Sequence, residues 1–397
     1  MLEKQLNEVV WFQEGPGVRN TQYTTSGVKL LNVANLSDGK IVLANSTRYI
    51  SKDEAYGKYK HFLCDAGDLI IASSGIKVDY IDKKMGIVTE DMLPLCMNTS
   101  TIRFKVKNTN ELKLKYLMYF FKSDKYKEQI QKLITGSAQL NYGPSHLNKV
   151  KITMYPLKEQ EKIVKELDQL TSILSKKQEK IEKYNLLIKS QFNEMFGDPK
   201  INPNKYEIVK IEKLFDVGSS KRVFESQWTN SGVPFYRARE IVKLSKDGFV
   251  NNELFITSEM YEEYKSIFGV PQANDIMVTG VGTLGICYIV KDSDKFYFKD
   301  GNILWFKNKG LCDARFIFEQ YKLDYVREQI ESNANPSTVG TYTIANAKNT
   351  LVLVPPLELQ QKYGNFCKHI DKLKFAIKKS IEKYELCYQS LMQKYFG

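Results

Sequence analysis

Apolar side chains recur at alternating steps of four and three residues along two long stretches of the chain. In the first stretch, 163–195, Lys177 is the residue that interrupts this spacing, and the second stretch, 363–395, is less regular. Such a spacing places the apolar side chains on one stripe of a helix, as in the seam of a coiled coil. We therefore predict long helices over 155–197 and 355–397. The predicted seam positions are Ile163, Leu167, Leu170, Leu174, Ile181, Tyr184, Ile188, Ile370, Ile377, Tyr384 and Leu391.

Prolines and a glycine mark the ends of these predicted helices. Pro355 and Pro356 stand before the second helix, and Gly197, followed by Asp198 and Pro199, is typical of a helix end. A helix of about 40 residues extends roughly 60 Å, and a helix with a single apolar stripe is not stable alone. We expect the two helices to pack antiparallel on each other, with one globular domain at each end. The alternative is that each helix packs on its own globular domain.

The two helical stretches are part of an internal repeat. Residues 181–197 and 381–397 are identical at eight of 17 positions, with an offset of 200 residues. Upstream, 26–28 matches 231–233 at an offset of 205. An offset that is constant in the helices and drifts elsewhere indicates one scaffold whose loops differ in length. The chain is therefore expected to hold two copies of one unit, the second beginning at residue 198.

Each copy begins with about 150 residues in which short β-branched and aromatic runs alternate with turn residues. These runs are 39–43, 68–72 and 100–106 in the first copy and 275–279, 285–290 and 302–306 in the second. A helix is expected at 112–122. Short strands interleaved with a few helices predict a mixed α+β domain over 1–154 and another over 198–354.

Composition and charge narrow the class of protein. The net charge of +12 favours a polyanionic partner, although many lysine-rich proteins bind no nucleic acid. No apolar stretch is long enough to span a membrane, and the first residues lack the features of an export signal, so we expect a cytoplasmic protein without membrane contact. The six cysteines form no C-x-x-C pair and the three histidines lie far apart, so we expect reduced core cysteines and no metal site.

One glycine-rich segment has the letters of a nucleotide-binding motif without its context. Residues 280–285 read G-x-G-x-x-G, but a dinucleotide fingerprint needs a helix after the glycines to hold the pyrophosphate. The residues that follow, 286–290, are β-branched and aromatic, which predicts a strand–turn–strand loop instead. The sequence also lacks an N-P-P-Y-like methylation motif, a phosphate-binding P-loop and an H-E-x-x-H zinc motif. This lack of a catalytic signature favours a binding protein.

The chain as a whole resembles the specificity (S) subunits of Type I restriction–modification enzymes. The likeness is strongest in 135–142, which reads TGSAQLNY, and in 150–164, which leads into the first heptad helix. The segments 67–71 and 13–20 also look like elements of that family's recognition domains. The second copy departs from the pattern, with Leu359-Gln360 where Glu-Gln is usual.

This resemblance implies an α+β fold with two pseudo-two-fold-related target recognition domains, 1–154 and 198–354. Two long antiparallel coiled-coil helices, 155–197 and 355–397, would separate them. It implies that each domain reads one half of a bipartite, asymmetric site in double-stranded DNA. The helices would set the spacer and dock DNA methyltransferase (M) subunits, two of them, and restriction (R) subunits would join such a complex. In that family the partners bind S-adenosylmethionine and ATP, so we assign no cofactor, metal or catalytic residue to this chain.

Basic, amide, hydroxyl and aromatic side chains in the predicted loops are the candidate DNA contacts. Arg and Lys suit guanine edges, Asn and Gln suit adenine, and all of them can bind phosphates. Arg237 and Arg239 alternate on a predicted strand and would share one face. The candidates in the first copy are Arg19, Asn20, Gln22, Tyr23, Ser73, Ser74, Lys77, Gln139, Asn141 and Tyr142. Those in the second copy are Lys221, Arg222, Arg237, Arg239, Thr279, Thr283, Ser337, Thr341 and Tyr342.

Two other functions fit parts of this pattern. The specificity subunit of a related system with fused methylation and cleavage activities would share the duplicated layout. A coiled-coil adaptor whose globular ends bind proteins would share the helices. Salt-sensitive retention on duplex DNA together with a methyltransferase subunit would separate these functions, because counterion release makes DNA binding fall steeply with salt.

Overall fold

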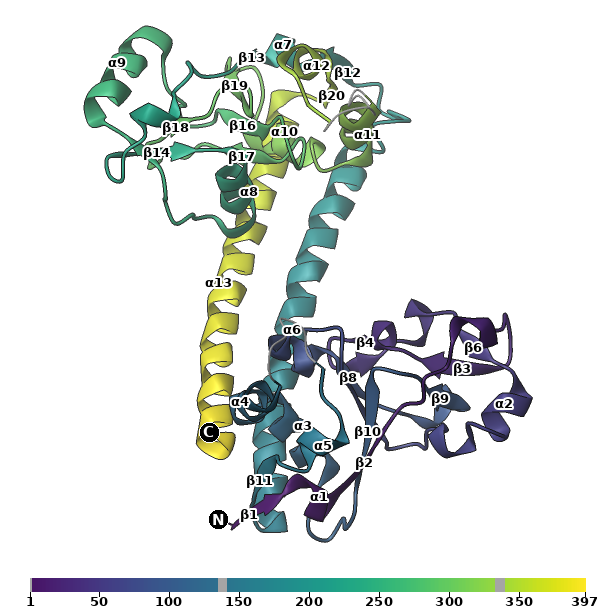
Figure 1. Ribbon diagram of the computed structural model, residues 1–397. Helices are drawn as coiled ribbons and strands as arrows, with labels where there is room; N and C mark the ends of the chain where they lie inside the picture. Colours follow the sequence, from purple (N-terminus) through teal and green to yellow (C-terminus); the bar gives the residue numbers. More distant parts are fainter. Residues whose placement is uncertain (1, 135–140, 333–339) are drawn as a thin grey trace. The chain divides into compact units, whose positions relative to one another are not determined.

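The computed structural model describes residues 2–134, 141–332 and 340–397, and the chain divides into two compact units (Figure 1). Unit 1 comprises Met1–Gln178 and Lys378–Gly397, and unit 2 comprises Glu179–Ile377. Each unit therefore holds the globular domain of one copy, the start of that copy's long helix, and the end of the other copy's long helix.

Unit 1 consists of short strands and helices joined by turns. Its strands are β1 (Leu2–Gln5), β2 (Val10–Glu14), β3 (Val28–Leu31), β4 (Leu36–Ser37), β5 (Lys40–Ile41), β6 (Tyr49–Ile50), β7 (Leu69–Ala72), β8 (Met85–Ile87), β9 (Leu95–Met97), β10 (Thr101–Val106) and β11 (Lys151–Met154). Its helices are α1 (Leu6–Val9), α2 (Lys52–Tyr56), α3 (Leu114–Lys122), α4 (Asp124–Leu133), α5 (Pro144–Leu147) and the first part of α6 (Leu157–Phe196).

A four-stranded antiparallel sheet is the centre of unit 1. Its strand order is β2-β10-β7-β8, and every residue of β7 is buried, so both faces of the sheet are covered. Helices α3 and α4 cover one face, where the ring centroids of Phe104 on β10 and Phe121 on α3 lie 4.8 Å apart. The other face packs on the core of a smaller sheet with the order β6-β3-β9, in which β3 and β9 are parallel.

Unit 2 has the same organisation. Its strands are β12 (Glu207–Lys210), β13 (Phe215–Gly218), β14 (Val233–Tyr236), β15 (Phe255–Ile256), β16 (Ile276–Thr279), β17 (Cys287–Ile289), β18 (Tyr297–Phe298), β19 (Ile303–Asn308) and β20 (Leu351–Val354). Its helices are α7 (Ile211–Leu214), α8 (Ala238–Asp247), α9 (Ser258–Phe268), α10 (Ala314–Gln320), α11 (Asp324–Ser332), α12 (Ile344–Asn349) and the first part of α13 (Leu357–Phe396).

The predicted internal repeat is confirmed element by element. The central sheet of unit 2 has the order β13-β19-β16-β17, which is the order of the equivalent strands in unit 1. The smaller sheet β15-β14-β18 likewise corresponds to β6-β3-β9. A glycine precedes β3 and β14 at equivalent positions, Gly27 and Gly232, with φ of 133° and 127°. A Cβ there would lie 2.1 Å and 2.3 Å from the carbonyl oxygens of Ile50 and Ile256, so both copies require glycine.

The long helices match the predicted ranges closely. Helices α6 and α13 each contain 40 residues, and each begins directly after a proline, Pro156 or Pro356. Helix α6 ends before Gly197, whose φ of 75° lies in the left-handed region that glycine adopts easily.

In each unit the end of one long helix packs on the start of the other. In unit 1, Tyr395 donates a hydrogen bond to Glu166 at 2.7 Å, and Lys177 lies 5.3 Å from the ring centroid of Tyr384. Residue numbers rise along α6 as they fall along α13, so these segments are antiparallel. In unit 2 the hydroxyl of Tyr363 donates to the carbonyl oxygen of Ile188 at 3.2 Å.

The predicted seam positions are all at least partly buried, and the predicted packing of helix on helix is found within each unit. The starts of both helices also contribute to the core of their own domain, as Ile163 and Leu167 do in unit 1. The alternative arrangement, in which each helix packs on its own domain, is therefore also partly present. Lys177, which interrupts the heptad spacing, is accommodated because its ammonium group lies over the ring of Tyr384.

A buried glutamine connects each long helix to its own domain. Gln160 is fully buried; its Oε1 accepts from the backbone N–H of Lys113 at 2.9 Å, and its Nε2 donates to the carbonyl oxygens of Glu111 and Tyr155, both at 2.8 Å. In the second copy Gln360 occupies the same position. Its Oε1 accepts from a backbone N–H of the domain at 3.0 Å, and its Nε2 donates to a carbonyl oxygen before the helix at 2.7 Å.

Two details differ from the predictions. The run 39–43 forms only the two-residue strand β5, because residues 43–45 turn into a short 3₁₀ helix. The helix expected at 112–122 begins two residues later, at Leu114. The G-x-G-x-x-G segment, in contrast, is a turn between β16 and β17, as predicted.

Candidate nucleic-acid interface

The first group of predicted DNA contacts lies on a 3₁₀ turn, η1 (Asn20–Gln22), in unit 1. Arg19 and Asn20 are exposed, as a DNA contact requires. Gln22 instead points inward, where its Nε2 donates to Glu54 at 2.6 Å and to the hydroxyl of Tyr59 at 3.1 Å. Tyr23 is half-buried beneath the guanidinium of Arg48, 5.1 Å from its ring centroid. The side chains of Gln22 and Tyr23 therefore pack beneath this surface and do not project from it.

The loop after β7 brings together residues that are distant in sequence. The backbone N–H of Tyr142 donates to the carbonyl oxygen of Ser73 at 3.0 Å, and Ser74 forms a β-bridge with Asn141. Ser73 and Tyr142 are 1% exposed, so neither side chain reaches the surface in this structure, and their contact with DNA stays a prediction. Tyr142 contributes its ring to the core of unit 1. Asn141 is exposed, and Ser74 is half-buried with its Oγ donating to that of Ser100 at 2.6 Å.

Lys77 follows this loop and is exposed, which leaves it available to a phosphate. Two further predicted contacts, Gln139 and Ser337, lie outside the described residues.

In the equivalent loop of unit 2, a threonine side chain forms hydrogen bonds with the loop backbone. Thr279 is fully buried; its hydroxyl donates to the carbonyl oxygen of Thr283 and accepts from the backbone N–H of Ile286 at 3.0 Å. Tyr342 is 2% exposed and its hydroxyl lies 2.6 Å from that of Thr350. Both are therefore interior residues in this structure, and their contact with DNA stays a prediction. Thr283 and Thr341 are exposed beside them.

The arginines of unit 2 are paired with carboxylates. The expectation that Arg237 and Arg239 alternate on a strand is wrong, because β14 ends at Tyr236 and α8 begins at Ala238. The cause is local: Glu240 accepts from the backbone N–H of Arg237 at 2.9 Å, a contact that starts the helix. Both guanidinium groups bind Glu240, and Arg239 also binds Glu253.

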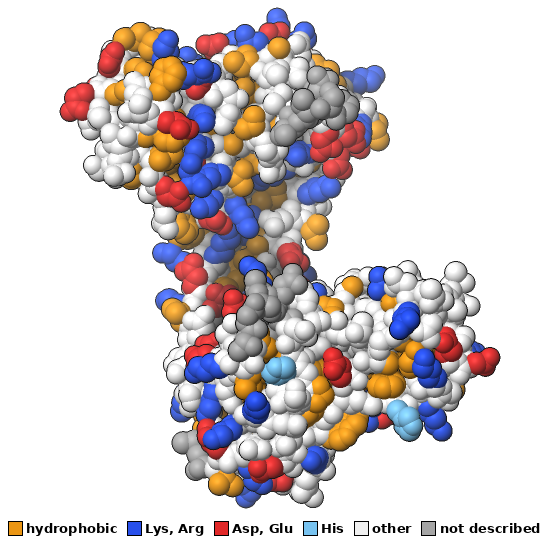
Figure 2. Space-filling model, in the orientation of Figure 1, with side chains coloured by type: hydrophobic (Ala, Val, Ile, Leu, Met, Phe, Trp, Pro, Cys, Tyr) orange, Lys and Arg blue, Asp and Glu red, His pale blue; other side chains and the backbone are white. Residues whose placement is uncertain are grey.

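This cluster of two arginines and two glutamates carries no net charge when all four are ionised. Burial of Glu240 opposes ionisation, but the hydrogen bonds from Arg237 and Arg239 outweigh it and hold the pKa of the carboxyl below its usual value. Elsewhere in unit 2, Lys221 is exposed and Arg222 binds Asp300 at 2.9 Å. Figure 2 shows further Lys and Arg side chains gathered around α8 on the face in view.

A recess in unit 1 was not among the predicted contacts. It has a volume of about 490 Å³ and lies between the end of β3, the segment before β6, and the turn before β10. Its polar lining includes Asn32, Asn45, Ser46, Thr47 and Arg48. The only signal in the sequence is the local density of Asn, Ser, Thr and Arg in 45–48, which is equally typical of an ordinary solvated loop.

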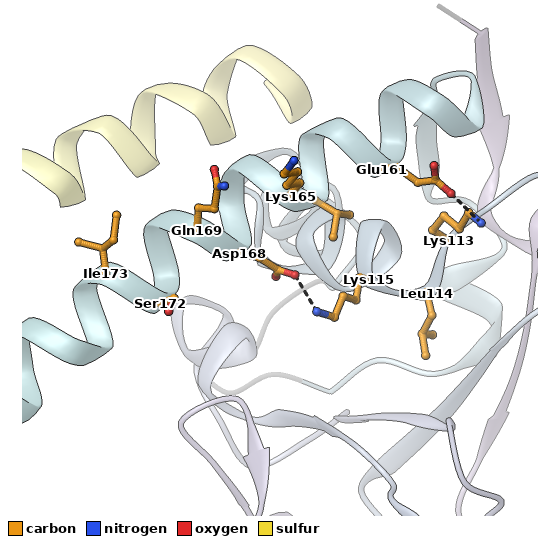
Figure 3. Close-up of a pocket in the computed structure, with 10 residues that line it drawn as sticks. Lys113, Leu114, Lys115, Glu161, Lys165, Asp168, Gln169, Ser172 and Ile173 are labelled. Carbon is orange, nitrogen blue, oxygen red and sulfur yellow. Dashed lines mark hydrogen bonds and ion pairs between the residues drawn. The ribbon is translucent and has the colours of Figure 1, made fainter.

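The start of α6 carries a groove of about 900 Å³ in unit 1 (Figure 3). Two ion pairs join the segment at the start of α3 to α6 along this groove, Lys113 with Glu161 at 3.0 Å and Lys115 with Asp168 at 2.6 Å. The apolar side chains of its lining are Leu114, Val164 and Ile173.

The second copy has a different residue at the same place on its long helix. Gly364 stands where the first copy has Val164, and a Cβ there would lie 2.6 Å from Oδ1 of Asp313. The carboxylate of Asp313 thus lies against the second helix at the position where the first helix carries the side chain of Val164, and the two helix bases are not equivalent surfaces.

The buried thiols do not suit nucleophilic chemistry. Burial raises the pKa of Cys64, Cys96 and Cys312 to about 12, and that of Cys367 to about 11, so these thiols stay protonated at neutral pH. Among the described residues, no group of three His, Cys, Asp or Glu side chains is placed to hold a metal ion. In the same residues, no helix has the length and apolar character of a membrane span.

Comparison with known proteins gives a consistent result. The family model of the Type I restriction modification DNA specificity domain matches the chain twice, over residues 4–183 and 203–384. A putative type I restriction enzyme specificity subunit of Haemophilus influenzae is 26% identical over 267 residues, which cover 64% of this chain and 66% of that protein. The putative MjaX specificity subunit of Methanocaldococcus jannaschii is 23% identical over 92% of this chain and 85% of its own length.

A solved structure has the same fold along the whole chain. The S subunit of a Type I restriction–modification system from M. genitalium matches with a TM-score of 0.59 and 15% identity. The match covers 100% of this chain and 96% of that structure.

Proposed function

Because the chain belongs to the family of Type I restriction modification DNA specificity domains, we propose that it is the DNA-specificity subunit of a restriction–modification complex. Each of its two α+β domains, 1–154 and 198–354, reads one half of a bipartite, asymmetric site in double-stranded DNA. The chain itself contributes recognition and no catalytic step. Methylation, and cleavage where a restriction subunit is present, belong to its partners, together with S-adenosylmethionine and ATP.

The observation that carries this proposal is the duplication itself. Two domains with the same strand order, each followed by a 40-residue helix, are what a reader of two separate half-sites requires. A single half-site would need only one such domain. The positive charge supports the same function. The excess of Lys and Arg over Asp and Glu gives the chain a net charge of +12, which attracts a DNA duplex that carries two negative phosphates per base pair.

The exposed candidates in each copy are the proposed DNA contacts. In the first copy these are Arg19, Asn20, Lys77 and Asn141, and in the second they are Lys221, Thr283 and Thr341. Arg222 and Arg239 would exchange the carboxylates of Asp300 and Glu253, which are half-buried and exposed, for a phosphate or a base edge when DNA binds. Arg237 would reach DNA from its pair with the buried Glu240.

The long helices have the proposed roles of spacing the half-sites and docking methyltransferase subunits. Large apolar side chains remain exposed on both helices, which marks surfaces that a protein partner can cover. These residues are Leu186, Leu187, Leu373, Phe375 and Leu386. The groove of unit 1 adds a concave apolar surface flanked by ion pairs (Figure 3). Two methyltransferase subunits, one for each copy, and additional restriction subunits complete the proposed complex.

The test is to map methylated bases in the DNA of cells that express this chain with a methyltransferase subunit. We expect one bipartite motif with a gap of fixed length. Methylation without such a gap would contradict the proposal. Retention of the purified complex on duplex DNA should fall steeply with rising salt, whereas a protein-binding adaptor would show no retention.

A further inference from the structure

The corner at the C-terminal end of β3 differs in chemistry from its counterpart at the end of β14. The two positions are equivalent because the same backbone hydrogen bonds build them. Leu30 N–H donates to the carbonyl oxygen of Arg48 at 2.9 Å, and Phe235 N–H donates to that of Leu254 at 2.9 Å. We call these regions the first corner, built on Asn32 and residues 45–48, and the second corner, built on Arg237, Arg239, Glu240 and Glu253.

The first corner contains amides, hydroxyls and one arginine. Asn32 is 9% exposed, and its side chain accepts from Asn98 at 2.8 Å and donates to Ser46 at 3.2 Å. Asn45, Thr47 and Arg48 are exposed around the recess. None of the described residues that line the recess is acidic. This is a set of donors and acceptors held open to solvent.

Arg48 is held in place without a carboxylate. Its guanidinium lies 5.1 Å from the ring centroid of Tyr23, and the hydroxyl of Tyr23 accepts from Asn98 at 3.4 Å. Within the described part of the chain, Arg48 makes no ion pair. The contact with a ring that is itself held by Asn98 positions the guanidinium of Arg48, and no carboxylate of the described residues occupies its N–H groups. Such an arrangement suits bidentate recognition of a guanine edge.

The second corner places ion pairs at the corresponding positions. Asn32, whose backbone N–H donates to Asn35, corresponds to Arg237, whose backbone N–H donates to Glu240. The neutral amide pair of the first copy has become an arginine–glutamate pair in the second. The glycine before the strand and the strand order of both sheets are common to both copies, but a 3₁₀ turn of residues 33–35 follows Asn32 where α8 follows Arg237.

We infer that these two corners are base-reading surfaces and that their difference makes the two half-sites different. This inference rests on the proposed function. Two copies of one scaffold can read unlike sequences only through positions where they differ, and the exposed members of the two corners differ, with Arg48 in the first and Arg239 and Glu253 in the second. The inference assigns specificity to Asn45, Thr47 and Arg48, none of which stood out in the sequence, and it pairs them with Arg237 and Arg239 in the other copy.

The test uses the full chain in complex with its methyltransferase subunit, with randomised duplex DNA as the ligand and sequencing of the bound fraction. Arg48→Ala and Arg48→Lys remove the guanidinium fork, and the lysine variant keeps the charge. We expect one base position in one half-site to lose discrimination by roughly tenfold to hundredfold in both variants. The other half-site and the gap should stay as in the wild type, which also shows that each variant is folded.

Lys77→Ala is the matched control, because an exposed lysine that binds phosphate should weaken binding to all sequences equally. If both Arg48 variants retain the complete wild-type motif while the wild type reads a bipartite site, the inference is wrong and the proposed function stands. The same holds if both Arg48 variants lower affinity for every sequence as Lys77→Ala does. If the wild type selects no bipartite motif, the proposed function fails and the inference fails with it.

Discussion

The side chain of Phe396, one residue from the C-terminal end, belongs to the core of unit 1. It is 1% exposed, and its ring centroid lies 5.0 Å from that of Tyr116 and 6.5 Å from that of Phe120, both on α3. The end of α13 therefore stabilises the domain of the first copy, about 275 residues earlier in the sequence. Phe396→Ala should destabilise unit 1 and leave unit 2 as it is.

The magnitude follows from the size of the cavity that this substitution leaves. Phe-to-Ala substitutions in cores cost about 3–5 kcal/mol, so we expect a loss of at least about 3 kcal/mol. A free energy of this size raises the population of opened unit 1 by roughly a hundredfold. It is also a substantial fraction of the 5–15 kcal/mol by which domains are typically stable.

Phe196→Ala is the matched control because Phe196 has the corresponding position in unit 2. Its ring centroid lies 4.9 Å from that of Phe316 and 5.6 Å from that of Tyr363. Hydrogen exchange followed by mass spectrometry resolves the two units through peptides from α3 and from α10. Phe396→Ala should lower protection in α3 alone, and Phe196→Ala should lower it in α10 alone.

Two results would refute this reasoning. Unchanged protection of α3 in Phe396→Ala would mean that the C-terminal end of α13 does not contribute to the core of unit 1. Equal loss of protection in α3 and α10 for both variants would mean that the two units unfold as one, and that their separation into two cores has no energetic meaning.

Three further predictions concern single side chains. Gln160→Leu should lower the free energy of unfolding by about 3 kcal/mol because it leaves three partly buried backbone groups unpaired. Gln360→Leu leaves two backbone groups unpaired and should cost about 2 kcal/mol, which urea titrations measure. The ionised Glu240 contributes to the free energy of unfolding; this contribution should be fully present above the ordinary pKa of 4.5 and should be lost as the pH falls through the lowered pKa of the folded state. Glu240→Gln should therefore be less stable than the wild type at neutral pH and nearly equal to it in acid. Lys177→Gln should cost no more than about 1 kcal/mol by removing the contact with Tyr384, and a double-mutant cycle with Tyr384→Leu measures that contact directly.

The long helices and the duplication could be predicted because their signals are local or repeated. Heptad spacing determines which side chains share a stripe, and the stripe positions are buried or half-buried as predicted. The end at Gly197 follows from the conformational freedom of one residue. The G-x-G-x-x-G turn was likewise predicted from the strand-like residues that follow it.

The exposure of the candidate DNA contacts could not be predicted because residue type does not reveal which way a side chain points. Tyr142 and Tyr342 stand in polar loops, but each backbone N–H is bound by a segment more than 60 residues earlier and each ring lies in the core. Arg237 and Arg239 carry the charge expected of a DNA reader, but two glutamates neutralise it.

The order of apolar and polar residues alone determined that this chain has two copies of an α+β domain and two long helices, since periodicity acts between near neighbours and a repeat is visible in the sequence itself. Only the tertiary structure decided which of the candidate side chains are exposed. Arg48 acquires an oriented guanidinium because Tyr23 and Asn98, 25 and 50 residues away, meet beside it. Contacts between residues so far apart in the sequence depend on how the sheets pack as a whole, and no local pattern of side chains encodes them.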